Sequence, residues 1–256
     1  MIKGHVETNR DYWNDFAPHW VAAGEWLWAR DTPVWGNWNT PDEVVTLLPA
    51  DMTGLDAVEL GCGTGYVAAW MTRRGAKVTA IDVSREQLAT ARRLAAKHGT
   101  DITFIEGNAE TTGLPDATFD FAVSEYGAAI WCDPDLWLPE AFRLLRPGGR
   151  LAFLGTHPLA HAATPLSGAA ADFTLHRPWR ELERLDWSDA EVEPGGIEFN
   201  RSFAGWFAVF RRTGFSVLDY HEIYATGDRP GIGEAIPLDW AEKYPSEQVW
   251  WLKKPV

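Results

Sequence analysis

A glycine-rich turn contains the residue types and spacing that point most directly to chemistry. The apolar run 57–60 leads into glycine at three alternate positions, Gly61, Gly63 and Gly65, and then into a helical pattern. Glycine has no Cβ, so the backbone can bend tightly and a ligand can lie directly on it, while the helix start offers unpaired N–H groups. The turn is therefore predicted to hold a nucleotide-like molecule, although alone it could also be a purely structural bend.

The spacing of these glycines narrows the class of ligand. Dinucleotide-binding turns follow the pattern G-x-G-x-x-G, whereas this chain has G-x-G-x-G and places Tyr66 where the last glycine would stand. The sequence therefore disfavours an NAD-dependent oxidoreductase.

A carboxylate after the next apolar run supports the ligand interpretation. The run 77–82 ends in Asp82, seventeen positions beyond Gly65. A carboxylate at the end of the second strand of a parallel sheet lies beside the first turn and can accept both ribose hydroxyls of a bound adenosine. Asp82 alone could be a helix N-terminal acid before Ser84, but together with Glu59 and the glycines it indicates a ligand.

These residues must be positioned by a sheet. Strands are expected at 57–60, 77–82, 102–105, 119–124 and 151–154, with helices at 65–74, at 84–98 and from 133 onward between them. Strands separated by helices of this length imply right-handed crossovers and a parallel, doubly wound sheet with its ligand at the carboxyl ends of the strands. Outside this core, helices are expected at 8–16, 20–30, 41–48 and 203–213, a hairpin at 191–199, and the last two strands at 215–224 and 248–252.

The composition excludes several classes of function. The chain has 256 residues and 46% apolar content, which fit one α/β domain, and its formal charge of −13 is spread out without a Lys/Arg cluster. Nucleic acids and anionic membranes are therefore disfavoured as partners. The sequence also contains no apolar run of about eighteen residues, the length needed to span a membrane. The two cysteines favour a reduced, cytoplasmic setting over a disulfide framework. No metal is expected, because His157 and His161 are separated by Pro158 and lack a third ligand.

Four motifs in order carry a resemblance to a known family. They are E-L-G-C-G-T-G at 59–65, I-D-V-S at 81–84, N-A-E with L-P-D-A-T-F-D between 108 and 120, and L-R-P-G-G-R at 145–150. With them the chain resembles the class I S-adenosylmethionine-dependent methyltransferases, in particular the small-molecule group. The resemblance is close over residues 55–154 and looser over the last third. It implies S-adenosyl-L-methionine as the cofactor.

The resemblance also implies an arrangement of the whole chain. It predicts an α/β, Rossmann-like methyltransferase fold with a doubly wound, mostly parallel seven-stranded sheet whose last strand is antiparallel. One domain would cover 1–256, with an N-terminal helical cover over 1–50, a cofactor-binding core over 51–155, a lid insertion after strand five over 156–200, and a final helix and strands over 201–256.

The predicted cofactor contacts lie along the carboxyl edge of the sheet and in the N-terminal cover. In sequence order they are Tyr12, Trp13, Glu59, Gly61, Cys62, Gly63, Gly65, Asp82, Val83, Gln87, Asn108, Ala109, Glu110 and Ser124. Family members commonly carry Asp where this chain has Asn108, whose amide oxygen can also accept from the adenine amino group. Tyr12 and Trp13, with His19, would form an aromatic wall over the methionine end of the cofactor, or alternatively only pack a helix onto the sheet.

Methyl transfer requires few catalytic groups from the protein. It is an in-line displacement at a sulfonium methyl, so donor and acceptor must be aligned and water excluded, and neither a metal nor a covalent nucleophile is required. A hydroxyl or amine acceptor would benefit from a base. His157, which follows the strand 151–154, is the first candidate, and Glu125 and Tyr126 come next.

The leading hypothesis is a methyltransferase that acts on a small, apolar or aromatic molecule. The chain has fifteen tryptophans, six of them before residue 40, and so dense a cluster outside the sheet suggests a cover over a flat or apolar ligand. The alternative is a non-catalytic module that only binds S-adenosylmethionine or S-adenosylhomocysteine. The sequence leaves the acceptor and the oligomeric state open.

Overall fold

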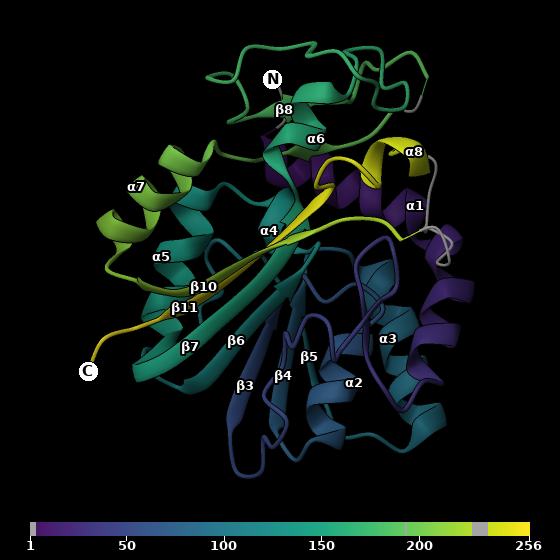
Figure 1. Cartoon of the computed structure of the whole chain (residues 1–256). Coiled ribbons are helices and arrows are strands. Elements are labelled where there is room, and N and C mark those ends of the chain that lie inside the picture. The colour runs from purple at the N-terminus through teal and green to yellow at the C-terminus, as the bar shows by residue number, and fades with distance from the viewer. Residues whose placement is uncertain (1–3, 193, 227–234) are drawn as a thin grey trace.

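The computed structural model describes residues 4–192, 194–226 and 235–256 (Figure 1). Within these residues seven strands form one sheet in the order β10-β11-β7-β6-β3-β4-β5. Their bounds are β3 (Asp56–Leu60), β4 (Lys77–Asp82), β5 (Thr103–Glu106), β6 (Phe119–Glu125), β7 (Leu145–Thr156), β10 (Ser216–Ile223) and β11 (Glu247–Lys253). Strands β3 to β7 pair in parallel, whereas β11 is antiparallel to both of its neighbours. The predicted doubly wound, mostly parallel seven-stranded sheet is confirmed.

Helices cover both faces of the sheet. One apolar core forms around α2 (Tyr66–Arg73) and the inner face of α3 (Arg85–His98), and α1 (His5–Trp28) packs on these two helices. The other core lies beneath α5 (Pro134–Leu144) and α7 (Phe203–Thr213), which pack against each other. The chain order reverses between β3 and its neighbour β6, and such a switch point leaves a crevice at the carboxyl ends of the strands.

The turn after β3 needs glycine for steric reasons. Gly61 has φ +77°, and a Cβ at this position would lie 2.6 Å from the backbone nitrogen of Ala128. The loop that follows β6 therefore packs directly on the glycine turn. This contact joins the ends of the two central strands into one wall.

The structure differs from the predicted helices in two places. The predicted helices 8–16 and 20–30 are one continuous helix, α1, with Pro18 inside it. The predicted helix 41–48 is an irregular turn that follows a small ribbon of β1 (Val34–Trp35) and β2 (Thr40–Pro41). Backbone hydrogen bonds from Val44 and Val45 to Pro41 O form one turn, and the Asp42 carboxylate holds it by accepting from Trp35 Nε1 at 3.0 Å and from Arg74 Nη2 at 2.5 Å.

The segment 156–200 lies above the carboxyl ends of the central strands, at the top of Figure 1. It contains α6 (Pro158–Ala163) and a short ribbon of β8 (Leu185–Asp186) and β9 (Ile197–Glu198). Of the hairpin expected at 191–199, residue 193 lies outside the described residues, and the second arm pairs with residues 185–186 further back. Two single-turn helices, α4 (Ala128–Trp131) and α8 (Leu238–Ala241), complete the elements. None of the helices in the described ranges has the length and apolar character needed to cross a bilayer.

Candidate active site

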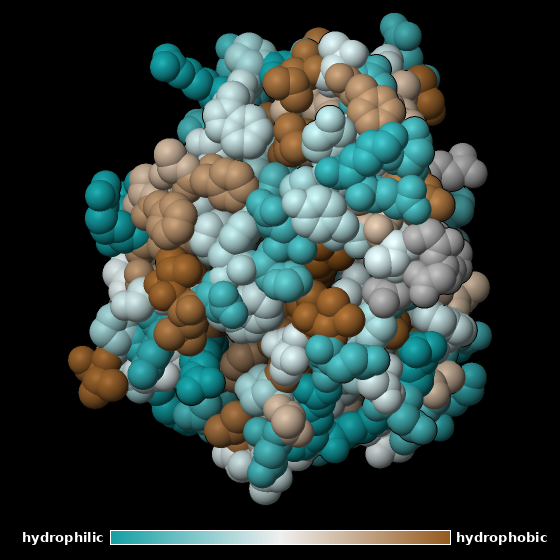
Figure 2. Space-filling view, in the orientation of Figure 1, coloured by the Kyte–Doolittle hydropathy of each residue, from teal (hydrophilic) through white to brown (hydrophobic). Residues whose placement is uncertain are grey.

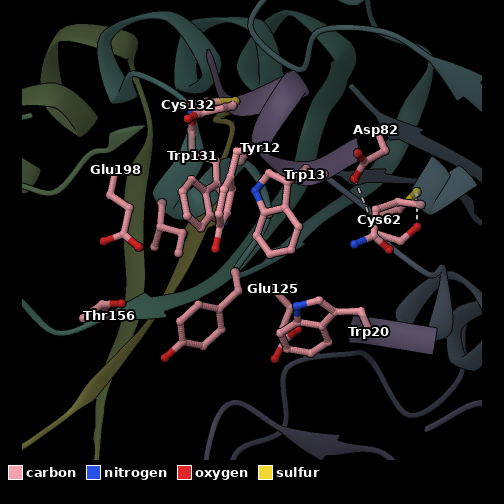
Figure 3. Close-up of a pocket in the computed structure, with 18 of the residues that line it drawn as sticks. Tyr12, Trp13, Trp20, Cys62, Asp82, Glu125, Trp131, Cys132, Thr156 and Glu198 are labelled. Carbon is pink, nitrogen blue, oxygen red and sulfur yellow. Dashed lines mark hydrogen bonds between the residues drawn. The ribbon is translucent and has the colours of Figure 1, made fainter. Parts of the chain in front are cut away.

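A cavity of about 380 Å³ lies where the carboxyl ends of β3, β4 and β6 meet α1 and the segment 156–200. Its volume falls in the range of small-molecule sites. The space-filling view shows a recess with hydrophobic side chains near the centre of the face turned toward the viewer (Figure 2). The wall combines residues from the glycine turn with residues far away in the sequence, as Figure 3 shows.

Most of the predicted cofactor residues line one side of this cavity. Those on the wall are Tyr12, Trp13, Glu59, Gly61, Cys62, Gly63, Asp82, Val83, Gln87, Asn108 and Ala109. The carboxylate of Asp82 is fixed at the turn, because its Oδ2 accepts from the Gly63 N–H at 2.7 Å and its Oδ1 accepts from the Ser84 N–H at 2.8 Å. Burial raises the pKa of Asp82, and these two backbone donors oppose the change.

Glu59 fixes the other side of the turn. Its Oε2 accepts from the Ala68 N–H in the first turn of α2 at 2.8 Å, and burial raises its pKa well above the ordinary value. The carboxyl group thus ties strand β3 to the helix that follows it. This contact keeps the helix N-terminus aimed at the cavity.

The space over the turn suits a bound cofactor. A Cβ at Gly63 would meet no atom within 4 Å, so the cavity continues directly over this residue. An open surface over glycine, next to a fixed carboxylate, fits a nucleoside with free hydroxyl groups.

Three predicted contacts shape the wall without lining it. Gly65 has φ +78° and begins α2. Glu110 holds a loop through its Oε1, which accepts from the Asp133 N–H at 2.7 Å. Ser124 donates its hydroxyl to Leu60 O at 2.7 Å. The side chains of Glu110 and Ser124 support neighbouring backbone, and none of the three residues lines the cavity.

The first candidate base, His157, does not reach the cavity, which corrects the prediction. It is only 2% exposed, and its Nδ1 accepts from the Leu159 N–H at 3.1 Å, so the ring caps α6. Burial lowers the pKa of His157 to about 4. The physical reason is alternation along extended backbone: Thr156 at the end of β7 faces the cavity, so the next side chain points away.

The other two candidates line the cavity, but their polar atoms are occupied. Glu125 accepts from the Gly36 N–H at 3.0 Å through Oε1 and from the Tyr66 hydroxyl through Oε2. Burial raises the pKa of Glu125. Its carboxylate therefore connects the end of β6 to the segment between β1 and β2.

Tyr126 makes a similar connection one residue later. Its hydroxyl donates to Glu247 Oε1 at 2.7 Å and accepts from Asn37 Nδ2 at 2.9 Å. Tyr126 has φ +54°, a conformation that an ordinary side chain adopts only when its surroundings hold it there. Glu125 and Tyr126 thus both close the cavity floor by holding residues 36–37.

Aromatic rings form one side of the cavity. Tyr12 and Trp13 lie beside Trp131, with ring centroids 5.8 and 5.1 Å apart, and Trp20 joins them (Figure 3). His19 stacks on a neighbouring ring of α1 and does not line the cavity. Trp131 gave no signal in the sequence, because it ends the single-turn helix α4, which is too short for a hydrophobic period to show.

The far end of the cavity has no signal in the sequence. Its lining residues Thr156, His161, Trp187 and Glu198 all come from the segment 156–200. They follow no spacing that predicts a shared site. In the described part of the chain no group of three or more His, Cys, Asp or Glu side chains is placed to hold a metal ion.

Comparisons with known proteins agree with this geometry. A family model described as "Methyltransferase domain" matches residues 58–153. The chain is 34% identical to a malonyl-[acyl-carrier protein] O-methyltransferase from Pectobacterium atrosepticum, over 56% of this chain and 50% of the relative. It is 32% identical to a chloroplastic 2-methyl-6-phytyl-1,4-hydroquinone methyltransferase from Oryza sativa subsp. japonica, over 70% of this chain and 53% of the relative. The chain thus spans about half the length of the curated relatives it matches.

A solved structure supports the fold. The crystal structure of an S-adenosylmethionine-dependent methyltransferase from Mesorhizobium loti superposes with a TM-score of 0.65 at 24% identity, covering 82% of this chain and 95% of that chain. The glycine turn and the carboxylate at the end of β4 both lie in the region that the family model matches. Residues 58–153 therefore belong to the methyltransferase domain family, and the chain has the fold of the S-adenosylmethionine-dependent methyltransferases, whose cofactor is S-adenosyl-L-methionine.

Proposed function

We propose that this protein transfers the methyl group of S-adenosyl-L-methionine to a small, apolar or aromatic acceptor held under the segment 156–200. The observation that carries the proposal is that one cavity includes both the glycine turn with Asp82 and a wall of aromatic rings. The rice relative is named for a phytyl hydroquinone, an acceptor of this type, and the bacterial relative for a malonyl group on a carrier protein.

The charge of the cavity favours this cofactor over a dinucleotide. Four carboxylates line it, from Glu59, Asp82, Glu125 and Glu198, whereas no Lys or Arg among the described residues does. Carboxylates attract a sulfonium cation and repel the pyrophosphate of a nicotinamide dinucleotide, and the effect is strengthened where water is excluded. This electrostatic argument is independent of the glycine spacing.

The cavity residues would have separate roles in cofactor binding and in acceptor binding. The bound cofactor supplies an activated methyl group, and Asp82 and Asn108 would hold its adenosine portion beside the turn. Tyr12, Trp13 and Trp131 would exclude water from the reacting groups and orient a flat acceptor by ring contacts. Alignment of donor and acceptor in this closed space is the main source of rate enhancement that methyl transfer needs.

Two measurements test the proposal. Calorimetry should show that S-adenosylhomocysteine binds and that NAD does not. The purified protein should then form S-adenosylhomocysteine from S-adenosylmethionine with at least one member of a panel of hydroquinones, phenols, carboxylic acids, amines and thiols. Binding without turnover across the panel would instead favour the non-catalytic module, and binding of NAD alone would contradict both.

A further inference from the structure

A chain of hydrogen bonds at the far end of the cavity ends in Glu198. We propose that Glu198 is the general base of the reaction: it takes the proton of an acceptor hydroxyl and is held in place by His161 and Asn200. The proposal rests on the proposed methyl transfer and adds the class of acceptor, a phenol-type or alcohol O–H, to it.

The chain begins at Asn200, whose side-chain amide can adopt only one orientation. Its Oδ1 accepts from three donors, the Arg201 N–H at 2.8 Å, Trp206 Nε1 at 3.3 Å and Gln248 Nε2 at 3.3 Å. Rotating the amide by half a turn would place its NH₂ group against these donors. Its Nδ2 therefore faces the other way and donates to Thr156 O at 2.9 Å and to His161.

The orientation of Asn200 fixes the tautomer of His161. Asn200 Nδ2 lies 2.8 Å from Nδ1 of the imidazole, so that this nitrogen must accept. The single ring proton is then on Nε2, which lies 2.8 Å from Glu198 Oε2 and donates to it. His161 is buried, and both of its nitrogens are occupied. It is therefore a positioning residue for Glu198 and not the base itself.

Glu198 is held from a second direction as well. It lies in β9, and the preceding residue, Ile197, exchanges two backbone hydrogen bonds with the side chain of Asn9 in α1. The donor–acceptor distances are 2.6 Å from Ile197 N to Asn9 Oδ1 and 2.8 Å from Asn9 Nδ2 to Ile197 O. Glu198 is thus part of a rigid wall formed by α1 and the segment 156–200.

The second oxygen of Glu198 is available for an acceptor. Its side chain lines the cavity with 17% exposure, and Oε1 has no hydrogen bond with any described residue. Figure 3 shows Glu198 on the opposite side of the cavity from Asp82, with Tyr12 and Trp131 between them. An acceptor lying against these rings would therefore place its hydroxyl oxygen between the methyl group of the cofactor and Glu198 Oε1.

The reaction then balances without any additional reagent. The acceptor oxygen forms a bond to the methyl carbon while the carbon–sulfur bond breaks, and that electron pair stays on sulfur as a neutral thioether. The O–H proton passes to Glu198 Oε1 and is later released to solvent. A carboxylic acid acceptor is already ionised at neutral pH and would need no such base. A general base at Glu198 therefore indicates that the acceptor group is an un-ionised hydroxyl.

A matched pair of variants tests the assignment. The chain contains a second His–Glu pair, His157 and Glu222, 3.5 Å apart, and neither residue lines the cavity. With methylhydroquinone as acceptor, Glu198→Gln should lower kcat about 100-fold and remove the acid limb of the pH–rate profile. Affinity for S-adenosylhomocysteine and the melting temperature should stay the same, and Glu222→Gln should behave like the wild type. A Glu198→Gln rate within threefold of wild type, with the same pH profile, would overturn the proposal.

A second measurement does not depend on turnover. 4-Nitrophenol, whose neutral and ionised forms absorb at different wavelengths, is titrated with pH while bound to the S-adenosylhomocysteine complex. A carboxylate next to the phenol disfavours the phenolate, so the bound probe should have a higher pKa in the wild type than in Glu198→Gln. Equal values in the two proteins would refute the position of Glu198 at the acceptor. Absence of turnover with every acceptor of the panel would refute the proposed function itself, and the two failures are thus distinguishable.

Discussion

Replacing Glu247 by Gln should stabilise the protein at alkaline pH. Glu247 begins β11 and is completely buried. Its Oε1 accepts from the Asn37 N–H at 2.8 Å and from the Tyr126 hydroxyl at 2.7 Å, whereas Oε2 has no partner among the described residues. Burial raises the pKa of Glu247 to about 8, although these two donors oppose the change. The folded protein therefore favours the uncharged acid.

The size of the effect follows from this pKa. Between the ordinary value of 4.5 and about 8, the folded state binds more protons at Glu247 than the unfolded state does. The free energy of unfolding therefore falls as pH rises through this window, by about 5 kcal/mol in total. Gln resembles the protonated acid at every pH. The substitution should be nearly neutral at pH 5 and stabilising by about 2–5 kcal/mol at pH 9, where the lower figure allows for an amide nitrogen without an acceptor.

Urea unfolding followed by tryptophan fluorescence at pH 5, 7 and 9 measures this difference. Thermal melts at pH 9 should show a rise of about 5–10 °C for a chain of this size. The same substitution at exposed Glu43 controls for the loss of one negative charge from a chain of net charge −13. The reasoning is refuted if Glu247→Gln stabilises equally at pH 5 and pH 9, or if it has no effect at pH 9.

Four further substitutions test the site. Asp82→Ala should abolish S-adenosylhomocysteine binding in calorimetry, because the carboxylate beside the turn is lost; unchanged affinity would contradict the cofactor assignment. Gly63→Ala should weaken that binding and lower the free energy of unfolding by only about 1–2 kcal/mol. Gly61→Ala should unfold at a much lower urea concentration, because its Cβ would clash with backbone atoms. An equal loss of stability in the two variants would contradict this reasoning. Asn9→Ala should lower the free energy of unfolding by about 2 kcal/mol and speed amide exchange at Ile197, and an unchanged exchange rate would show that α1 does not hold β9.

Much of the fold and the cofactor half of the site could be predicted from local patterns. Strand, glycine turn and helix follow one another within 57–74, and Asp82 ends the next strand, so the residues that hold the cofactor are close in sequence or at equivalent strand ends. Parallel topology then brings them together. The predicted wall residues Glu59, Gly63 and Asp82 lie where this logic places them.

The acceptor half depends on contacts between distant residues. Thr156 rather than His157 faces the cavity because of where the strand ends, and a shift of one residue along extended backbone changes which side chain points inward. The continuity of α1 through Pro18 likewise follows from its packing, which propensity alone does not reveal.

The sequence by itself determined the sheet, the glycine turn and the carboxylate that follows it, because each is a short-range pattern with one physical meaning. Only the tertiary structure decided that Glu198 faces the cavity, that His161 donates to it, and that Glu247 is buried beneath Tyr126. In these roles the side-chain direction is set by hydrogen bonds to partners up to 210 residues away.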